Sequence, residues 1–164
     1  MYTGHLSDGV VTSLGSGAVS DTTSETTTAV EDMQGFDGIR FVVAFGDVDA
    51  SAVLTLQPKE NTASSTSSPT PTAIDISNGA VSGAVTAVIT TGASVLTESS
   101  GNLDNLIVVV DVKKNEISKR YVFLSITAAT ESYEIVSIIT ERYHARELPV
   151  TIDDDNVSLV TAAS

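Results

Sequence analysis

The sequence predicts an all-β fold, a β-sandwich or jelly roll with an extended N-terminal arm. Ser and Thr make up about a quarter of the 164 residues, and Val and Ala dominate the apolar set. That balance disfavours helices and favours strands and turns. Several segments alternate apolar and polar residues, and Gly, Asn, Asp and Ser separate them. Short strands with such turns indicate a sandwich, a jelly roll or a small barrel.

The first 28 residues are polar, with Gly and Thr throughout. We interpret residues 1–28 as an extended arm that reaches a neighbouring subunit, with a short edge strand at Val10 and Val11. The alternative is a loop that lies on its own domain. Residues 29–150 are predicted to form the β-sandwich domain, and residues 151–164 a C-terminal tail with a short strand.

The central strand is expected over Phe36–Phe45, which is entered through a Gly turn. A spacing of two places alternate side chains on opposite faces of a strand. One face carries the large apolar residues and should supply much of the core, and the other face mixes polar and small residues. The two sets are Ile39, Phe41, Val43 and Phe45 on the first face, and Arg40, Val42 and Ala44 on the second.

The next segment, Ser51–Gln57, also alternates, and we expect it to pair with the central strand as a hairpin across a turn at residues 46–50. Pro58 should end this strand because proline cannot donate to a ladder. Lys59–Thr72 is rich in Ser, Thr and Pro and holds no core-forming residue. It is predicted to be a long loop, either an exposed excursion or a contact arm.

Short strands are expected at Ala73–Ile76, Ala80–Thr91 and Ala93–Thr97. In Ala80–Thr91 frequent alanine leaves a helix open, but Val, Ile and Thr together with Gly83 favour a strand. Leu103–Val112 is apolar on both faces, which indicates a strand deep in a sheet or under a neighbouring subunit. Two further strands are predicted at Tyr121–Thr127 and Ser132–Arg142.

The charge of the chain excludes several classes of partner. Eight Lys and Arg stand against 21 Asp and Glu, a formal net charge of −13. Nucleic-acid surfaces need clustered Lys and Arg, so we expect neither nucleic acid nor anionic lipid to bind. The longest apolar run, Leu106–Val110, is far shorter than the ~20 residues of a membrane helix. The chain lacks cysteine, which excludes disulfides and thiolate metal sites.

Few residues suggest chemistry. The only histidines are His5 and His144, and no nucleophile-elbow pattern surrounds any serine. The acidic run Asp153–Asp155 with Asn156 offers oxygen ligands for Ca²⁺, but it lacks the alternating spacing of an EF-hand loop. Asp47 and Asp49 alternate without a third ligand. We therefore expect no enzyme activity, no metal and no cofactor.

Half of the basic residues gather around one predicted turn. They are Lys113, Lys114, Lys119 and Arg120. On an acidic protein this cluster is the best electrostatic candidate for contact with another subunit or another acidic partner surface. The alternative is a solvated turn.

Three strand motifs resemble those of small structural proteins of tailed bacteriophages. They are Gly35-Phe-Asp-Gly-Ile-Arg-Phe41 after Asp32-Met33, then Val110-Asp-Val112, then Arg120-Tyr-Val122. The resemblance covers roughly residues 29–148, and the Ser/Thr/Pro-rich loop and Thr127–Tyr133 depart from it. The family is that of capsid decoration, or cement, proteins.

The resemblance implies a β-sandwich that binds the outer surface of the expanded head through the major capsid protein, after assembly in the host cytoplasm. It also implies a homo-oligomer, a trimer at three-fold positions being favoured over a dimer at two-fold positions. An alternative is another virion component, such as a head-tail connector, tail tube or fibre subunit. A bacterial adhesin or binding module is a further alternative.

Overall fold

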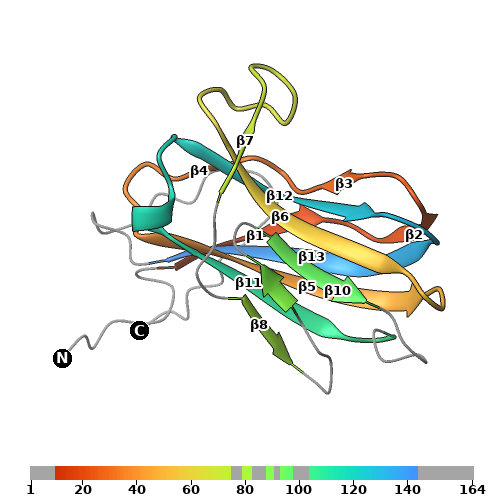
Figure 1. The fold of residues 1–164 in the computed structure, drawn as a ribbon. Helices are drawn as coiled ribbons and strands as arrows, with labels where there is room; N and C mark the ends of the chain where they lie inside the picture. The colour runs from red at the N-terminus through yellow and green to blue at the C-terminus, as the bar shows by residue number, and fades with distance from the viewer. Residues whose placement is uncertain (1–9, 75–78, 83–87, 91–92, 98–103, 144–164) are drawn as a thin grey trace, which may run out of the picture.

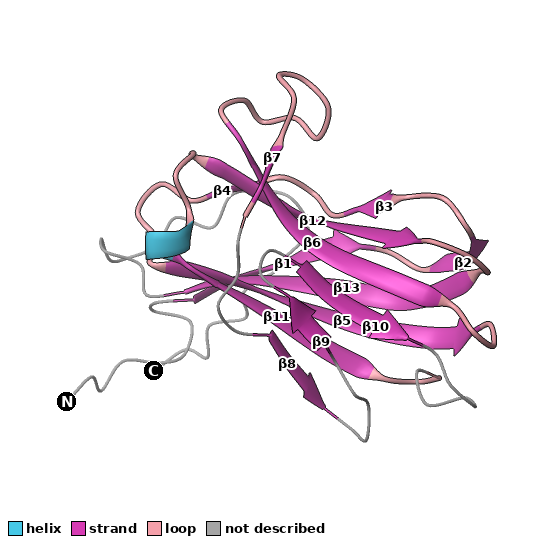
Figure 2. Cartoon of the chain, viewed as in Figure 1, coloured by secondary structure: helices cyan, strands magenta, loops and turns pink. Residues whose placement is uncertain are grey.

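The protein is a β-sandwich of two antiparallel sheets (Figure 1). The computed structural model describes residues 10–74, 79–82, 88–90, 93–97 and 104–143. Side chains are described for residues 10–74 and 104–143. Figure 2 shows that this part of the chain is almost entirely strand and loop, with one short 3₁₀ turn, η2 (Lys114–Glu116). The predicted β-sandwich is therefore confirmed.

Sheet A has six strands, and its central strand is β5, as the sequence predicted. The order along the sheet is β1 (Val10–Ser16), β13 (Tyr133–Tyr143), β5 (Gly38–Val48), β11 (Ile107–Lys113) and β8 (Gly79–Ser82). A further short strand, β2 (Val19–Thr22), also pairs with β13. Neighbours in this sheet come from distant parts of the chain, because β1, β5, β11 and β13 are separated by strands of the other sheet.

Sheet B has seven strands. The order is β3 (Thr26–Thr27), β12 (Tyr121–Ala128), β6 (Val53–Asn61), β10 (Ala93–Thr97) and β9 (Val88–Thr90). Two short strands complete it: β4 (Glu31–Asp32) pairs with β12, and β7 (Thr72–Ala73) pairs with β6. Ala80–Thr91 is strand where it is described, as preferred over helix, but it forms two strands and not one: β8 belongs to sheet A and β9 to sheet B.

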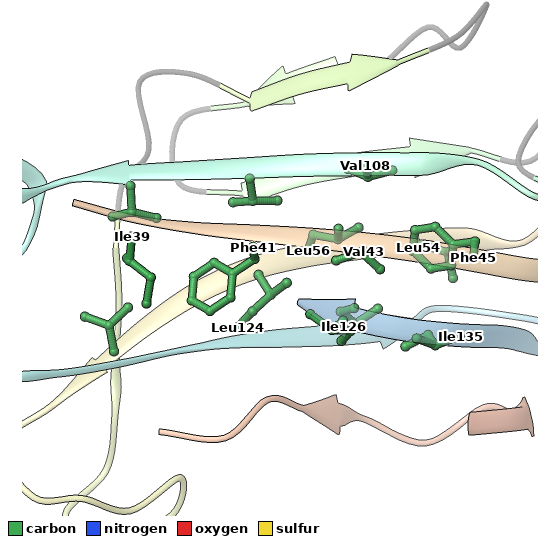
Figure 3. Packing of buried hydrophobic residues seen from close by; sticks show 14 of the residues in the cluster. Ile39, Phe41, Val43, Phe45, Leu54, Leu56, Val108, Leu124, Ile126 and Ile135 are labelled. Carbon is green, nitrogen blue, oxygen red and sulfur yellow. The ribbon is translucent and has the colours of Figure 1, made fainter. Parts of the chain in front are cut away.

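The core lies between the inner faces of the two sheets (Figure 3). The predicted inner residues of β5 are at most 2% exposed because they face sheet B. Fully burying an aliphatic or aromatic side chain of this size contributes about 1.5–3 kcal/mol. Their partners across the core are Leu54 and Leu56 of β6 and Leu124 and Ile126 of β12.

One ion pair joins the two sheets inside the sandwich. Glu31 of β4 and Arg142 of β13 approach to 3.2 Å between Oε2 and Nε, and both side chains are at least 90% buried. Ser13 of β1 donates to the other carboxylate oxygen of Glu31 at 2.5 Å. The guanidinium also donates to the carbonyl of Asp32 and lies over the Phe36 ring at 4.8 Å. A buried charge needs such partners, because desolvation is costly without them.

The predicted hairpin between the central strand and the next segment is wrong. β5 pairs with β11 and β13 in sheet A, whereas β6 pairs with β12 and β10 in sheet B. The connection between β5 and β6 therefore crosses from one sheet to the other, through a turn in which the N–H of Ala52 donates to the carbonyl of Asp49. Alternation shows that both segments are strands and does not show which sheet each one joins.

Pro58 does not end its strand, contrary to expectation. β6 runs on to Asn61, and Pro58 is opposite Leu124 in the ladder. Proline lacks only the donor, and its carbonyl still accepts from the N–H of Ile74 at 2.9 Å. The strand can therefore continue past it.

The N-terminal segment is extended, but from Val10 onward it belongs to the sandwich. β1 and β2 pair with β13, and β3 pairs with β12. Residues 10–27 thus add edge strands to both sheets of the same chain, which matches the alternative of a segment lying on its own domain. Residues 1–9 and the predicted tail at 151–164 lie outside the described residues.

The Ser/Thr/Pro-rich loop stands out from the sandwich between β6 and β7 (Figure 1). Its base is held by Asn61, which is fully buried. The Asn61 amide donates to the carbonyls of Ser65 and Pro69 at 2.7 and 2.9 Å, and its carbonyl oxygen accepts from the N–H of Thr62. From Thr62 to Ala73 the loop carries no charged residue. It is a fixed, neutral excursion rather than a linker.

Candidate interaction surface

Among the described residues, the most distinctive surface is the outer face of sheet A, the side turned away from sheet B. Strand pairing aligns its residues in rows that run across the sheet. One apolar row is Leu14, Ile139, Val42 and Val109, from β1, β13, β5 and β11. A second row is Ser137, Ala44 and Ile107. We call these two rows, with Val136 beside them, the apolar rows.

The apolar rows are open to solvent. Among the described side chains, four large hydrophobic ones are exposed, and all four belong to these rows. Their exposed fractions are 56% for Leu14, 49% for Ile107, 52% for Val136 and 39% for Ile139. Single exposed aliphatic residues are ordinary, but a contiguous apolar patch indicates a surface that another molecule covers.

A charged row borders the apolar rows. In it, Arg40 of β5 lies between Asp111 of β11 and Glu141 of β13. The guanidinium approaches Asp111 to 3.3 Å and Glu141 to 3.8 Å. Exposed pairs of this kind contribute little to stability, about 0–1 kcal/mol. The row therefore presents one cation whose charge two neighbouring carboxylates already offset.

Tyr143 closes this end of the face. Its hydroxyl donates to Asp111 at 2.5 Å, and the Arg40 guanidinium lies 5.7 Å from the centre of its ring. Burial and the hydrogen bond to the Asp111 carboxylate raise the pKa of Tyr143 far above the usual value of 10.0. The ring lies so close to Gly38 that a Cβ atom there would sit 2.3 Å from it. Gly38 is thus required for this packing.

A groove of about 660 Å³ opens beside Tyr143. Its walls carry both signs of charge: Arg40, Lys113 and Lys114 against Asp37, Asp111 and Glu141. Such a balance gives no strong preference for an anion or a cation. We regard the groove as the polar margin of the face and not as a separate binding site.

The structure divides the predicted cluster of basic residues into two pairs. Lys113 and Lys114 line the groove at the end of β11. Arg120 and Lys119 contact sheet B instead. Arg120 binds Asp32 of β4 through two atoms, at 2.9 Å from Nε and 2.6 Å from Nη2, and the Lys119 ammonium contacts the Thr72 hydroxyl.

The pairing with Arg120 has an electrostatic consequence. The Arg120 guanidinium lowers the pKa of Asp32 below its usual value of 3.8. Arg120 is thus already engaged by a carboxylate of its own chain. That the four basic residues of the predicted cluster contact a partner stays a prediction.

The other candidates are structural or lie outside the described residues. Asp49 accepts from the backbone N–H and hydroxyl of Ser132, at 3.2 and 2.6 Å, and so fixes a loop. His5, His144 and the acidic run Asp153–Asp155 with Asn156 fall outside the described ranges. Within those ranges no group of three His, Cys, Asp or Glu is placed to hold a metal. No helix among the described residues is long and apolar enough to span a membrane.

Patterns of charged or catalytic residue types in the sequence do not point to the apolar rows. The relevant pattern is in Leu103–Val112, which is apolar on both faces. That pattern indicates either a strand deep in a sheet or a strand under a neighbouring subunit. β11 lies inside sheet A, between β5 and β8. The face of β11 that is turned toward sheet B is buried in the core, and Ile107 on the other face remains half exposed.

No protein-family model matches this chain, and no curated protein matches it either.

Proposed function

We propose that the protein is a virion structural protein, a decoration protein that binds the outer surface of a phage capsid and stabilises the expanded head. The observation that carries this proposal is the bare aliphatic outer face of sheet A. A surface of this kind serves contact with other proteins. The strand motifs in residues 29–148 that resemble cement proteins supply the identity of the partner, a major capsid protein.

In this proposal, the many identical sites on the capsid supply the binding strength. A closed shell presents the same site many times, and an oligomer that holds several sites at once binds more tightly than one subunit. We propose a homo-oligomer. The family resemblance favours a trimer with the dimer as the alternative, whereas the exposed aliphatic outer face of sheet A suits a two-fold dimer. The neutral loop at residues 62–71 and the N-terminal residues 1–9 are the proposed capsid contacts.

The loop suits this role for two reasons. Asn61 fixes it before any partner arrives, so its ordering entropy is not lost on binding. It also lacks charge on a chain of net charge −13, so it can approach an acidic surface without repulsion.

Copy number in purified virions tests the proposal. Quantitative gel densitometry should give on the order of hundreds of copies per particle for a decoration protein. About six or twelve copies would instead identify a connector. A ring or tube in negative-stain images would favour a connector or tail component, and absence from the particle would reject a virion role.

Binding of the purified protein to expanded heads tests the contacts. Thr66→Asp in the loop and deletion of residues 1–9 should each lower occupancy. The matched control is Ser51→Asp, in the turn between β5 and β6, where the residue is also exposed and has φ of 72°. Deletion should stop at residue 9, since removal of β1 would break sheet A. Equal occupancy for all variants would reject these contacts.

A further inference from the structure

We propose that the outer face of sheet A is covered by the same face of a second copy of the chain, related by a two-fold axis. This inference names the subunit contact of the oligomer and rests on the proposed function only for its biological setting. Two sheets stacked in this way would lie about 10 Å apart, as sheets do inside a sandwich.

The first argument is the chemistry of the face. Its apolar rows join side chains from four adjacent strands of sheet A into one patch. No described side chain in these rows is charged. The four exposed large hydrophobic side chains of the described structure are all found here and nowhere on sheet B. A solvent-facing antiparallel sheet normally alternates apolar inward with polar outward, and the apolar rows depart from that pattern.

The second argument concerns which partner fits. A basic partner would be attracted to carboxylates, but the apolar rows offer none. The nearby carboxylates of Asp111 and Glu141 already pair with Arg40. Two copies of a chain with net charge −13 repel each other. Such copies associate most easily where both surfaces lack charge. The apolar rows are such a surface, and a second copy supplies the matching one.

The third argument is size. The five paired strands are 4 to 11 residues long and hold 40 residues in total. At ~4.8 Å between strands and ~3.4 Å per residue, their projected area is roughly 650 Å². A face covered with side chains has more accessible area than its projection. It therefore approaches the ~800 Å² that each partner buries in an interface of standard size.

Two-fold symmetry also gives the contact the usual anatomy of an interface. Ile139 lies within the apolar row, between Leu14 and Val42. An axis near Ile139 would stack apolar rows on apolar rows. It would place the Arg40 row and Tyr143 of each copy toward opposite edges. The result is an apolar centre with a polar, hydrated rim.

The experiment measures the mass of the purified full-length chain without any capsid, by sedimentation equilibrium over a range of concentrations. The wild type should reach twice the chain mass of 17.0 kDa. Ile139→Glu and Ile107→Glu each place two carboxylates within the contact and should weaken the dimer by about tenfold or more.

The matched control is Thr55→Glu, which adds the same charge to the outer face of sheet B and should leave the dimer intact. Circular dichroism melting checks that each variant is folded. If Ile139→Glu does not fold, Ile139→Thr provides a milder test at the same position. Its dimer should also be weaker.

Three results would overturn the inference. The full-length wild type could remain a monomer at every concentration. That result counts against the inference even if a chain without residues 144–164 associates. Its mass could be that of a trimer, which excludes a two-fold pair. Finally, both outer-face variants could dimerise as well as Thr55→Glu. None of these outcomes bears on the copy number in virions, so failure here is distinguishable from failure of the proposed function.

Discussion

The two faces of sheet A are built from the same strands and both carry aliphatic side chains, yet they meet different surroundings. On the inner face Phe41 and Val43 of β5 are fully buried against sheet B. On the outer face Ile139 and Ile107 stand in solvent. Alternation accounts for which residues share a face, but it does not say what covers that face. The inner face is covered by the chain itself, and we propose that a second copy of the chain covers the outer face.

The largest expected contrast comes from neighbouring residues of β5. Phe41→Ala removes a ring from the closed core and should lower the free energy of unfolding by about 3–5 kcal/mol. Val42→Ala points outward, and in dilute protein it should cost less than about 1 kcal/mol. Urea denaturation at low protein concentration measures both. Similar losses would show that the outer face is also packed within the monomer.

The ion pairs of the two faces should differ almost as much. Arg142→Met leaves Glu31 buried without its cation and should cost about 3 kcal/mol or more. Arg40→Met on the outer face loses contacts whose partners are 29–31% exposed and should cost less than about 1 kcal/mol. The same denaturation curves test this. Equal costs would mean that the two pairs are equally desolvated.

Two tyrosines of β13 extend the comparison. The Tyr133 hydroxyl, on the inner face, lies 2.9 Å from the Ser24 carbonyl and 2.9 Å from the Thr26 hydroxyl. Tyr133→Phe removes the donor from these part-buried acceptors and from the buried Ile126 carbonyl at 3.1 Å, and it should cost about 1–2 kcal/mol at neutral pH. Thermal unfolding measures this loss. A neutral result would indicate that water replaces the hydroxyl.

The smallest effect should be an alkaline one on the outer face. Because the pKa of Tyr143 is raised above 10.0 in the folded state, its phenol stays protonated where that of the unfolded chain ionises. The unfolded state then binds fewer protons, so stability is present below pH 10 and falls as the pH rises beyond it. Tyr143→Phe should flatten this decline, measured by urea denaturation between pH 9 and 11. An unchanged slope would contradict the assignment.

The sequence predicted the strands better than their partners. Leu106, Val108, Val110 and Val112 share a buried face of β11 and its lead-in, as alternation indicates. The described parts of Ala80–Thr91 are strands, as its β-branched residues indicate, but they lie in different sheets. Alternation is a local property, so it could not reveal that β5 and β6 belong to different sheets. Pairing between strands far apart in the chain depends on the whole fold.

The candidate surface was less predictable than the fold. Lys113, Lys114, Lys119 and Arg120 are close in sequence, but η2 and the start of β12 direct them to different neighbours. Leu14, Ile139 and Ile107 come from three distant segments, and only the pairing of β1, β13, β5 and β11 brings them together. No local pattern contains that information.

The loop held by Asn61 offers a use beyond the natural contacts of the protein. Its tip, Thr66 to Ser68, is exposed and lies between the two carbonyls that Asn61 clamps. Exposed loop tips accept inserted sequence more readily than any strand does. A foreign peptide spliced in between Thr66 and Ser67 would be presented away from both sheets. Because the same tip is a proposed capsid contact, the graft should be displayed on the free protein and should lower its occupancy on expanded heads.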